Sequence, residues 1–497
     1  MKLRGLFGAI DQGTTSTRFS LFTRDGGLAA SHQVPIPQYY RGPGEHTQDP
    51  KSYLTATQEC IGEAVRKAGV TRADVVGVGI TNQRETIVAW DRRTKEPLAE
   101  AIVWDDIRTA QDCDALATRL GGQNALRAAT GLPINPYFSA SKIAWLIRNN
   151  PLVKSALDQG NCCFSTVDSW LLSQLTDTPC PVTDISNASR TLLMNLQGKW
   201  EDRICELFGV PQSALPEIRS SAEIYGKMTI GALEGVPICG ALGDQQAALL
   251  GHGCTQVGQM KNTYGTGSFL LVNTGNTAMP SSNGLITTVY GQFGPSAPIT
   301  YALEGAIEAA GSCVNWAISS LNLAKDLSDF TATAQAVPDN GGVYFVPALG
   351  GLFTPYWRND ARGLFIGMTH HTVRGHLLRA ILEGIAFRTG EAVKAVEQDM
   401  NRIVEAVSVD GGMVANPFFL QLQADICGKR LEVPASRELT SVGAALAARV
   451  GCGDLKDWKE AKNATQTLKH VQPTSSNSDL LWAKWKDAVP RSFNWAK

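Results

Sequence analysis

Residues 243–268 read GDQQAALLGHGCTQVGQMKNTYGTGS and combine a carboxylate with a turn that can hold a phosphate group. Asp244 stands shortly before the apolar run 247–250, so we expect it at the entrance of a helix, ionised and pointing outward. The Gly-, Thr- and Ser-rich segment 264–268 offers backbone N–H groups and hydroxyls to an anion. The two features together favour transfer of a phosphoryl group.

The same chemistry occurs near the N-terminus. The apolar run 6–10 stops at Asp11-Gln12-Gly13-Thr14-Thr15-Ser16, and residues 19–22 resume it, which predicts a β-hairpin with a polar turn. Residues 261–273 predict a second hairpin around segment 264–268. A third candidate is strand 407–412, which ends in Gly-Gly before a helical stretch. Two similar anion-facing turns, far apart in the chain, indicate two related halves.

The fold class follows from the alternation of patterns. Residues 53–68 and 379–398 have the helical period, whereas 75–80 is a strand, and this alternation predicts a mixed α/β fold. A chain of 497 residues is too long for one hydrophobic core. We expect a division near Gly251 into domains 1–250 and 251–497, because the charge-free segment 262–303 starts a new set of strands.

Composition excludes several classes of protein. The formal net charge of −1 argues against bulk nucleic-acid binding, so we expect a small substrate. Gly, Pro, Asn and Ser interrupt segment 262–303 too often for a transmembrane helix, and no secretory signal is recognisable, so we expect a cytoplasmic protein. The 11 cysteines include no Cys-x-x-Cys pair, and His370-His371 lacks a carboxylate at ligand spacing. These patterns favour neither a disulfide framework nor a zinc site.

The polar turn at 13–16 has two interpretations. No Walker-type phosphate loop occurs, so any ATP must be held in another way. The hydroxyls and N–H groups of the turn, together with Arg18, would suit phosphates, and Asp11 could orient Mg²⁺ through its water shell. The alternative is an ordinary polar hairpin. The matching turn at 265–267 favours the interpretation that both turns bind phosphate groups.

Two further polar clusters follow buried strands. Segment 81–86, Thr-Asn-Gln-Arg-Glu-Thr, lies at the carboxyl end of strand 75–80, where ligands tend to bind. Segment 104–108, Trp-Asp-Asp-Ile-Arg, follows the apolar run 101–103 in the same way. The alternatives are a solvated Arg84-Glu85 loop pair and, at the second cluster, core packing of the Trp beside a surface salt bridge.

Nearly the whole chain resembles the FGGY family of carbohydrate kinases. Two segments fit the signature patterns of the family: YFSASKIAWL at 137–146, and 363–383 with its Gly367-Met368 and His376-Leu377 pairs. Segments 80–86, 243–249 and 261–267 are more similar to the glycerol-specific members than to the pentulose kinases. The resemblance therefore implies glycerol as the substrate and ATP with Mg²⁺ as cofactors, with homodimers or homotetramers common among similar proteins.

The resemblance also implies a fold and a site. The fold would be two ribonuclease-H-like domains of the actin and sugar-kinase type, with the active site in the cleft between them. Asp244 would be the base that accepts the proton of the attacking hydroxyl, and Asp11 would hold the Mg²⁺ shell. The substrate contacts would be Arg84, Glu85, Tyr137, Asp244 and Gln245, with Trp104 and Phe269 along the carbon edge. The nucleotide contacts would be Thr14, Thr15, Ser16, Arg18, Thr266, Gly311, Asn315, Gly412 and Asn416.

The chain departs from the family pattern at a few places, and two other functions stay open. Asn315 stands where Gln is usual, and residues 105–107 replace a common Gln-Asp-Thr. The nearest alternative is a kinase of another polyol or pentulose. The other is a non-catalytic ATP-binding module, against which the retention of Asp11 and Asp244 counts, because burying a carboxylate without a function costs stability.

Overall fold

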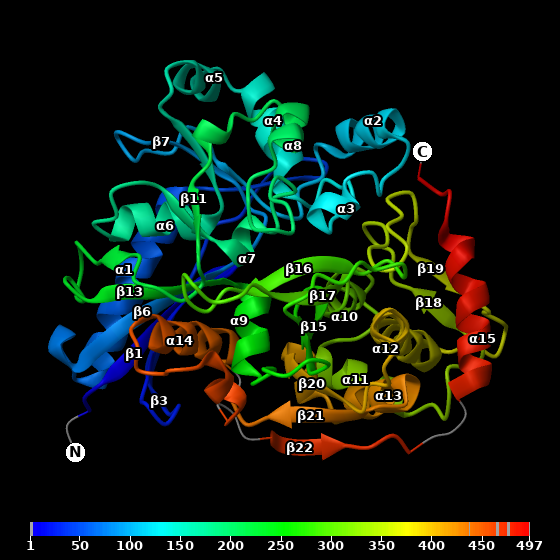
Figure 1. Ribbon diagram of the computed structural model, residues 1–497. Coiled ribbons are helices and arrows are strands. Elements are labelled where there is room, and N and C mark those ends of the chain that lie inside the picture. Colours follow the sequence, from blue (N-terminus) through cyan, green and yellow to red (C-terminus); the bar gives the residue numbers. More distant parts are fainter. Residues whose placement is uncertain (1–2, 437, 464–466, 475–477, 497) are drawn as a thin grey trace.

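The computed structural model describes residues 3–436, 438–463, 467–474 and 478–496, and two β-sheets form its centre (Figure 1). The first sheet has the strand order β12-β13-β6-β1-β2-β3, and the second has the order β16-β17-β15-β14-β20-β21-β22. The first sheet has three consecutive antiparallel strands (β3, β2 and β1), and the second has four (β16, β17, β15 and β14). In each sheet, two parallel strands and an antiparallel edge strand follow. The two halves are therefore built on one pattern, as the paired turns indicated.

The elements of the first half lie in the following ranges: β1 (Leu6–Gln12), β2 (Ser16–Phe22), β3 (Leu28–Pro35), β4 (Tyr39–Gly42), β5 (Glu45–Gln48), α1 (Pro50–Ala68), β6 (Val75–Asn82), β7 (Val88–Asp91), β8 (Ala101–Ile102), α2 (Ala110–Leu120), α3 (Arg127–Thr130), α4 (Ser139–Asn149), α5 (Pro151–Asp158), β9 (Cys162–Ser165), α6 (Val167–Leu175), β10 (Val182–Asp184), α7 (Ile185–Ala188), α8 (Asp202–Phe208), β11 (Glu217–Arg219), β12 (Gly226–Lys227), β13 (Pro237–Gly243) and α9 (Asp244–Gly251).

Those of the second half are β14 (Met260–Tyr264), β15 (Ser268–Gly275), β16 (Ile286–Gly291), β17 (Thr300–Ile307), α10 (Gly311–Ser319), α11 (Leu327–Gln335), β18 (Tyr344–Val346), β19 (Leu364–Ile366), α12 (Arg374–Met400), β20 (Ala406–Gly411), α13 (Pro417–Cys427), β21 (Arg430–Pro434), α14 (Leu439–Gly451), β22 (Thr467–Val471) and α15 (Ser478–Ala488).

The predicted hairpins and helices are confirmed, with shifted ends. Strands β1 and β2 pair antiparallel around the first turn, and β14 and β15 pair around the second. Helix α1 starts three residues before the predicted 53, because Asp49 caps it and Pro50 is tolerated in the first turn. Helix α12 extends the predicted 379–398 at both ends and stops at Asn401, which is left-handed with φ 45°.

Helices α9 and α14 join the two halves (Figure 1). Helix α9 continues from the first sheet but contacts β14 and β15 of the second, whereas α14 comes from the second half and packs on β1, β6 and β13. Where the helices cross, a Cβ on Gly443 would clash with the carbonyl oxygen of Ala247, so only glycine permits this approach. Each half thus contributes one helix to the packing of the other.

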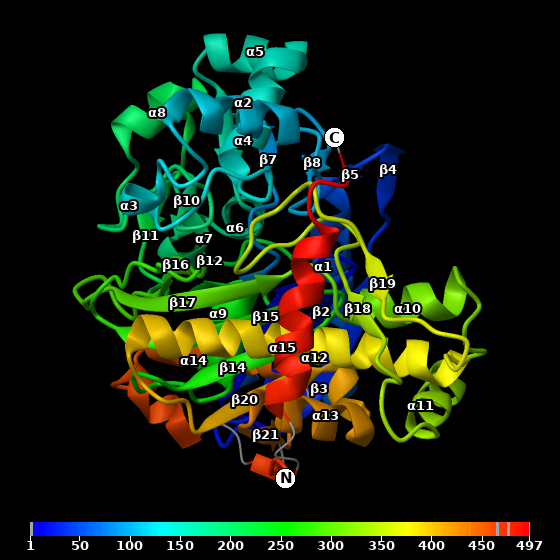
Figure 2. The same cartoon turned by 90° about the vertical axis from the view of Figure 1, so that its right-hand side faces the viewer.

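The long helix α12 organises the core of the second half. Most of its residues are buried, and α15 crosses its outer side (Figure 2), where Phe387 stacks on Trp485 at 4.9 Å between ring centroids. All 11 cysteines are free thiols. None of the helices in the described ranges has the length and apolar character needed to span a bilayer.

Candidate active site

The site is assembled where parallel strands end. Strands β1, β6 and β13 run parallel, with Asp11 beside Thr81 and Asn82 beside Gly243, so the segments that follow these strands meet at one sheet edge. In the second sheet, β14 and β20 are also parallel and end together, with Tyr264 beside Gly411. Carboxyl ends of parallel strands are where ligands bind in sheets of this kind.

Asp244 is the first residue of α9, as the sequence predicted. Its side chain is 29% exposed, so a ligand can reach it. The Oδ1 atom accepts a hydrogen bond from the backbone N–H of Gln245 at 2.7 Å and lies 3.2 Å from Nε of Arg84. The structure gives Oδ2 no hydrogen-bond partner within the described ranges. One carboxylate oxygen is therefore anchored, and the other is left for a ligand.

Arg84 belongs to a buried cluster of two arginines and two glutamates. Its Nη1 and Nη2 donate to the two carboxylate oxygens of Glu304, at 2.5 and 3.1 Å. Arg190 donates to Glu304 at 3.0 Å and to Glu85 at 2.6 Å. Glu304 and Arg190 are fully buried, so the ions are paired in a bidentate, charge-assisted arrangement rather than solvated. The solvated-pair interpretation of Arg84 and Glu85 is therefore wrong.

The two glutamates of this cluster titrate differently. Burial alone would raise the pKa of Glu304, but Arg190 and Arg84 hold it below its ordinary value. Burial raises the pKa of Glu85, although the same arginines act against it. Glu85 also has a left-handed backbone with φ 60°, a costly conformation for a residue with a side chain. Such strain is a feature of functional sites.

Three aromatic side chains stand beside the charged cluster. Trp104 makes edge contacts with Tyr137 and Phe269, at 5.8 and 6.1 Å between ring centroids. The guanidinium of Arg84 lies 5.8 Å from the ring of Phe269, and its Nη2 is 3.5 Å from the hydroxyl of Tyr137. Trp104 also donates from Nε1 to Oγ1 of Thr14 at 3.0 Å. These three side chains form an aromatic wall, which is connected to the first polar turn by this hydrogen bond.

A buried lysine fixes the segments that carry two of these aromatics. Lys142, in α4, is fully buried, and its ammonium donates to the backbone carbonyls of Trp104 at 3.2 Å, Tyr137 at 3.0 Å and Pro136. Burial lowers the pKa of Lys142 to about 8. Its three donors are satisfied by backbone oxygens, so it joins the loop of Trp104 to the loop of Tyr137.

Lys142→Met is expected to raise KM for the substrate about 10-fold, with a smaller effect on kcat, since the aromatic wall loses its charge-assisted anchor. The melting temperature should fall as well, because three carbonyls lose a donor. Steady-state kinetics and thermal melts would measure both effects. A lower melting temperature with an unchanged KM would mean that Lys142 stabilises the fold without shaping the site.

The first polar turn is held rigidly. The N–H of Gly13 donates to the carbonyl of Ser16 at 3.0 Å, and Gln48 donates to the carbonyl of Thr14 at 2.6 Å. Thr15 is exposed, whereas Thr14 and Ser16 are partly exposed. Arg18 lies opposite Asp11 in the hairpin and forms an ion pair with Glu438, next to α14. The turn thus presents hydroxyls outward from a fixed backbone.

The donor set around Asp11 fits a magnesium ion. Burial raises the pKa of Asp11 to about 6, with Arg18 acting against the shift and Asp244 adding to it. A buried carboxylate whose ionisation is opposed by its surroundings is stabilised by a cation bound beside it. The described part of the chain has no group of three or more His, Cys, Asp or Glu side chains that could hold a metal alone. Mg²⁺ needs no such cage, because it keeps several waters and takes one or two carboxylates plus phosphates.

The second polar turn is attached to the start of α10. The N–H of Gly311 donates to the carbonyl of Gly265 at 3.0 Å, and Thr266, which is exposed, accepts from Ala310 at 2.9 Å. A Cβ on Gly311 would lie 2.6 Å from the carbonyl oxygen of Gly265, so this contact requires glycine. Asn315 is exposed one turn further along α10.

The third segment lies beside the second turn, because β20 pairs with β14. Gly412 is exposed directly after β20. Asn416 caps α13 by accepting from the N–H groups of Phe418 and Phe419, and its Nδ2 donates to Thr331 at 3.0 Å. Asn416 therefore has a structural role, and its contact with a nucleotide stays a prediction.

Three charged residues of this site were not predicted from the sequence: Glu304, Arg190 and Lys261. A signal for Glu304 was present, because it ends the charge-free stretch 262–303 inside the apolar strand β17, and a lone buried charge requires a partner. Lys261 is likewise buried in a strand. Nothing in the local pattern around Arg190 points to the site.

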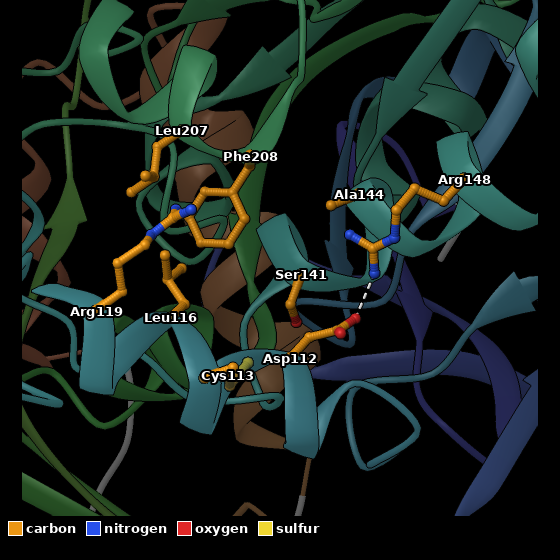
Figure 3. A pocket seen from close by; sticks show the side chains of 10 residues that line it. Asp112, Cys113, Leu116, Arg119, Ser141, Ala144, Arg148, Leu207 and Phe208 are labelled. Atoms are coloured by element: carbon orange, nitrogen blue, oxygen red, sulfur yellow. Dashed lines mark hydrogen bonds and ion pairs between the residues drawn. The ribbon is translucent and has the colours of Figure 1, made fainter.

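A separate cavity of about 330 Å³ lies between α2, α4 and α8 (Figure 3). It is lined by Leu116, Phe208 and other side chains, with an ion pair between Asp112 and Arg148. Helix α4 separates it from the site, because Ser141 lines the cavity whereas Lys142 reaches the loops of the aromatic wall. The cavity is thus no part of the candidate active site.

Comparison with known proteins gives matches along almost the whole chain. The N-terminal domain of the FGGY family of carbohydrate kinases matches residues 6–251, and the C-terminal domain matches residues 260–452. A glycerol kinase of Chloroflexus aggregans is 45% identical over 98% of this chain and 99% of its own length. A probable glycerol kinase of Caenorhabditis elegans is 43% identical over 99% of this chain and 100% of its own length.

Solved structures agree with these matches. A crystal structure of Plasmodium falciparum glycerol kinase with ADP has a TM-score of 0.90 and 35% identity, and covers 98% of both chains. A xylulose kinase from Lactobacillus acidophilus has a TM-score of 0.86 and 22% identity, with 98% of this chain and 99% of its own covered, and so shares the fold.

Proposed function

Because this chain belongs to the FGGY family of carbohydrate kinases, we propose that it transfers the γ-phosphoryl group of ATP to glycerol, giving sn-glycerol 3-phosphate and ADP. This reaction would be the first step of glycerol catabolism. The proposal depends above all on Asp244, which keeps one anchored and one available oxygen beside Arg84 and the aromatic wall. Relatives that share over 40% identity across their full length are named glycerol kinases, which supports glycerol over other polyols.

The proposed catalytic and substrate-binding roles fall to different residues. Asp244 takes the proton of the attacking primary hydroxyl through Oδ2, while Arg84 and the N–H of Gln245 hold Oδ1 in place. Arg84, Glu85, Tyr137 and Gln245 would bind the hydroxyls of the triol. Trp104 and Phe269 would cover its carbon edge. A site that pairs each hydroxyl rejects analogues that lack one, since its buried polar groups would be left without partners.

The nucleotide would lie between the two polar turns. Thr14, Thr15, Ser16 and Thr266 would bind phosphate oxygens through hydroxyls and backbone N–H groups. Gly311, Asn315, Gly412 and Asn416 would hold the adenosine end, and Arg18 would contribute positive potential beside the first turn. Asp11 would orient the water shell of Mg²⁺, which neutralises charge on the phosphates when bound. The raised pKa of Asp11 agrees with a site that attracts a cation.

A substrate panel tests the proposal against its nearest alternative, a kinase of another polyol or pentulose. Glycerol, dihydroxyacetone, erythritol and xylulose would be compared by coupled detection of ADP at saturating Mg-ATP. We expect kcat/KM to be highest for glycerol by about 10-fold or more, because each unpaired buried hydroxyl partner costs roughly 1–3 kcal/mol. A higher value for xylulose or erythritol would assign another substrate, and the absence of any polyol-dependent ADP release would indicate a non-catalytic ATP-binding module.

Three further features are proposed: two domains, a cytoplasmic location and an oligomeric assembly. Residues 1–250 and 251–497 would form two domains, since the first sheet ends with β13 and the second begins with β14. The chain would act in the cytoplasm. It would assemble as a homodimer or homotetramer, which size-exclusion chromatography with light scattering would measure.

A further inference from the structure

Lys261 is a buried cation that reaches from the second half of the molecule to the substrate-binding residues proposed above. It lies in β14 and is fully buried. Its ammonium donates to the side-chain oxygen of Gln245, to Oγ1 of Thr263 at 3.0 Å and to the carbonyl of Phe269 at 3.2 Å. The three donors of the ammonium are thus all used on fixed acceptors, two of which belong to predicted glycerol contacts.

The ammonium of Lys261 determines the orientation of the side-chain amide of Gln245. An ammonium has only donors, so the atom of Gln245 that meets Lys261 must be the carbonyl oxygen, Oε1. The amide nitrogen, Nε2, has no hydrogen-bond partner among the residues that the structure describes, although Gln245 is only 8% exposed. The oxygen is turned toward the protein, and the NH₂ group is the part left for a ligand.

The neighbouring glutamine provides a contrast. Gln246 is fully buried, its Nε2 donates to the carbonyl of Val289 at 3.1 Å, and its Oε1 lies 3.4 Å from Nη1 of Arg84. Both ends of that amide are satisfied within the protein, so Gln246 has nothing to offer a substrate. Only Gln245 of the pair combines a fixed orientation with a donor that has no protein partner.

We propose that Lys261 is a positioning residue that makes Gln245 a donor-only contact, so that the site selects a substrate oxygen that can accept a hydrogen bond at this position. This inference rests on the proposed function. It defines the substrate class more closely: a hydroxyl or a carbonyl oxygen satisfies the NH₂ group, whereas an ammonium does not, because it too has only donors. The positive charge of Lys261 also repels an ammonium on the substrate at this position.

The test uses glycerol and two amino-diols, 3-amino-1,2-propanediol and 2-amino-1,3-propanediol, which carry an ammonium at pH 7 in place of one hydroxyl. The discrimination ratio is kcat/KM for glycerol divided by that for the better amino-diol. We expect a ratio of about 100 or more for the unmodified enzyme, because a donor would face a donor. In Lys261→Met the amide can turn over and offer its oxygen, so the ratio should fall about 10-fold.

Gln245→Glu provides the converse variant. One carboxylate oxygen would stay with Lys261, while the other would accept from an ammonium, so the ratio should fall about 10-fold or more while Lys261 remains. Lys261→Arg keeps the donors and should restore a ratio near that of the unmodified enzyme. Melting temperatures of all variants would be measured alongside.

The outcomes separate this inference from the function on which it rests. If the unmodified enzyme does not phosphorylate glycerol, the proposed function fails. If it does, but Lys261→Met lowers kcat/KM for glycerol and both amino-diols by the same factor, then Lys261 only stabilises the fold and the inference is wrong. An unchanged ratio in Gln245→Glu would equally overturn it.

Discussion

Asp244→Asn is expected to lower kcat for glycerol by about 10²- to 10⁴-fold, while the affinity for ATP stays within a few fold of its original value. Asparagine keeps the size of the side chain and an oxygen that accepts from Gln245, so the local geometry should persist. What it lacks is a basic oxygen for the proton of the attacking hydroxyl. Steady-state ADP release gives kcat, and calorimetric titration gives the dissociation constant for ATP.

A matched control is Asp112→Asn, which removes a surface carboxylate from the ion pair with Arg148 at the separate cavity. Its activity should remain near that of the unmodified enzyme. Asp244→Asn with more than a third of the original kcat would contradict the assignment of the base. A loss of ATP affinity as large as the loss of kcat would place Asp244 in nucleotide binding instead.

The parts of the fold that sequence predicted are those specified by local chemistry. The two hairpins depend on short apolar runs and on the turn residues between them. The local sequence pattern therefore predicts strands β1, β2, β14 and β15. Position at a strand end likewise identified Arg84 as a site candidate, and position at a helix entrance identified Asp244. Strand order was not readable, because pairing such as β6 with β13 joins segments more than 150 residues apart.

The parts that sequence missed depend on contacts between distant segments. Arg84 and Glu304 lie 220 positions apart, and the partner of a buried ion is not encoded near it. The sequence pattern predicts Lys261 only as the first residue of the second hairpin, whereas its role follows from its contact with Gln245 across the two halves. Likewise, no local pattern shows that α14 packs on the first sheet rather than the second.

Glu304→Gln is expected to destabilise the protein by about 3–5 kcal/mol, which corresponds to a fall in melting temperature on the order of 3–10 °C. In the unmodified protein, Arg84 and Arg190 are balanced by Glu85 and Glu304, all four being buried. Glutamine removes one negative charge and leaves two buried cations with Glu85 as the one buried carboxylate of the cluster, beside the partly exposed Asp244. Since Arg84 also loses its bidentate partner, kcat/KM for glycerol should fall about 10-fold or more. Thermal melts at one fixed scan rate and steady-state kinetics would measure the two effects.

Removing a cation at the same time should relieve this imbalance. Arg190→Met leaves Arg84 with the two glutamates, whereas Glu304→Gln combined with Arg190→Met leaves Arg84 and Glu85 as a balanced pair. Arg190 also has a buried Nη1 without a hydrogen-bond partner within the described ranges, and methionine removes that unpaired donor. The free energy of unfolding of the double variant should therefore exceed the value expected from adding the two single changes. The difference, which is the interaction energy, should be about 1–3 kcal/mol, and the melting temperature should be correspondingly higher. Additive changes in the free energy of unfolding would mean that the four charges contribute to stability independently. The ion pairs of the cluster would then not be what keeps Arg84 beside Asp244.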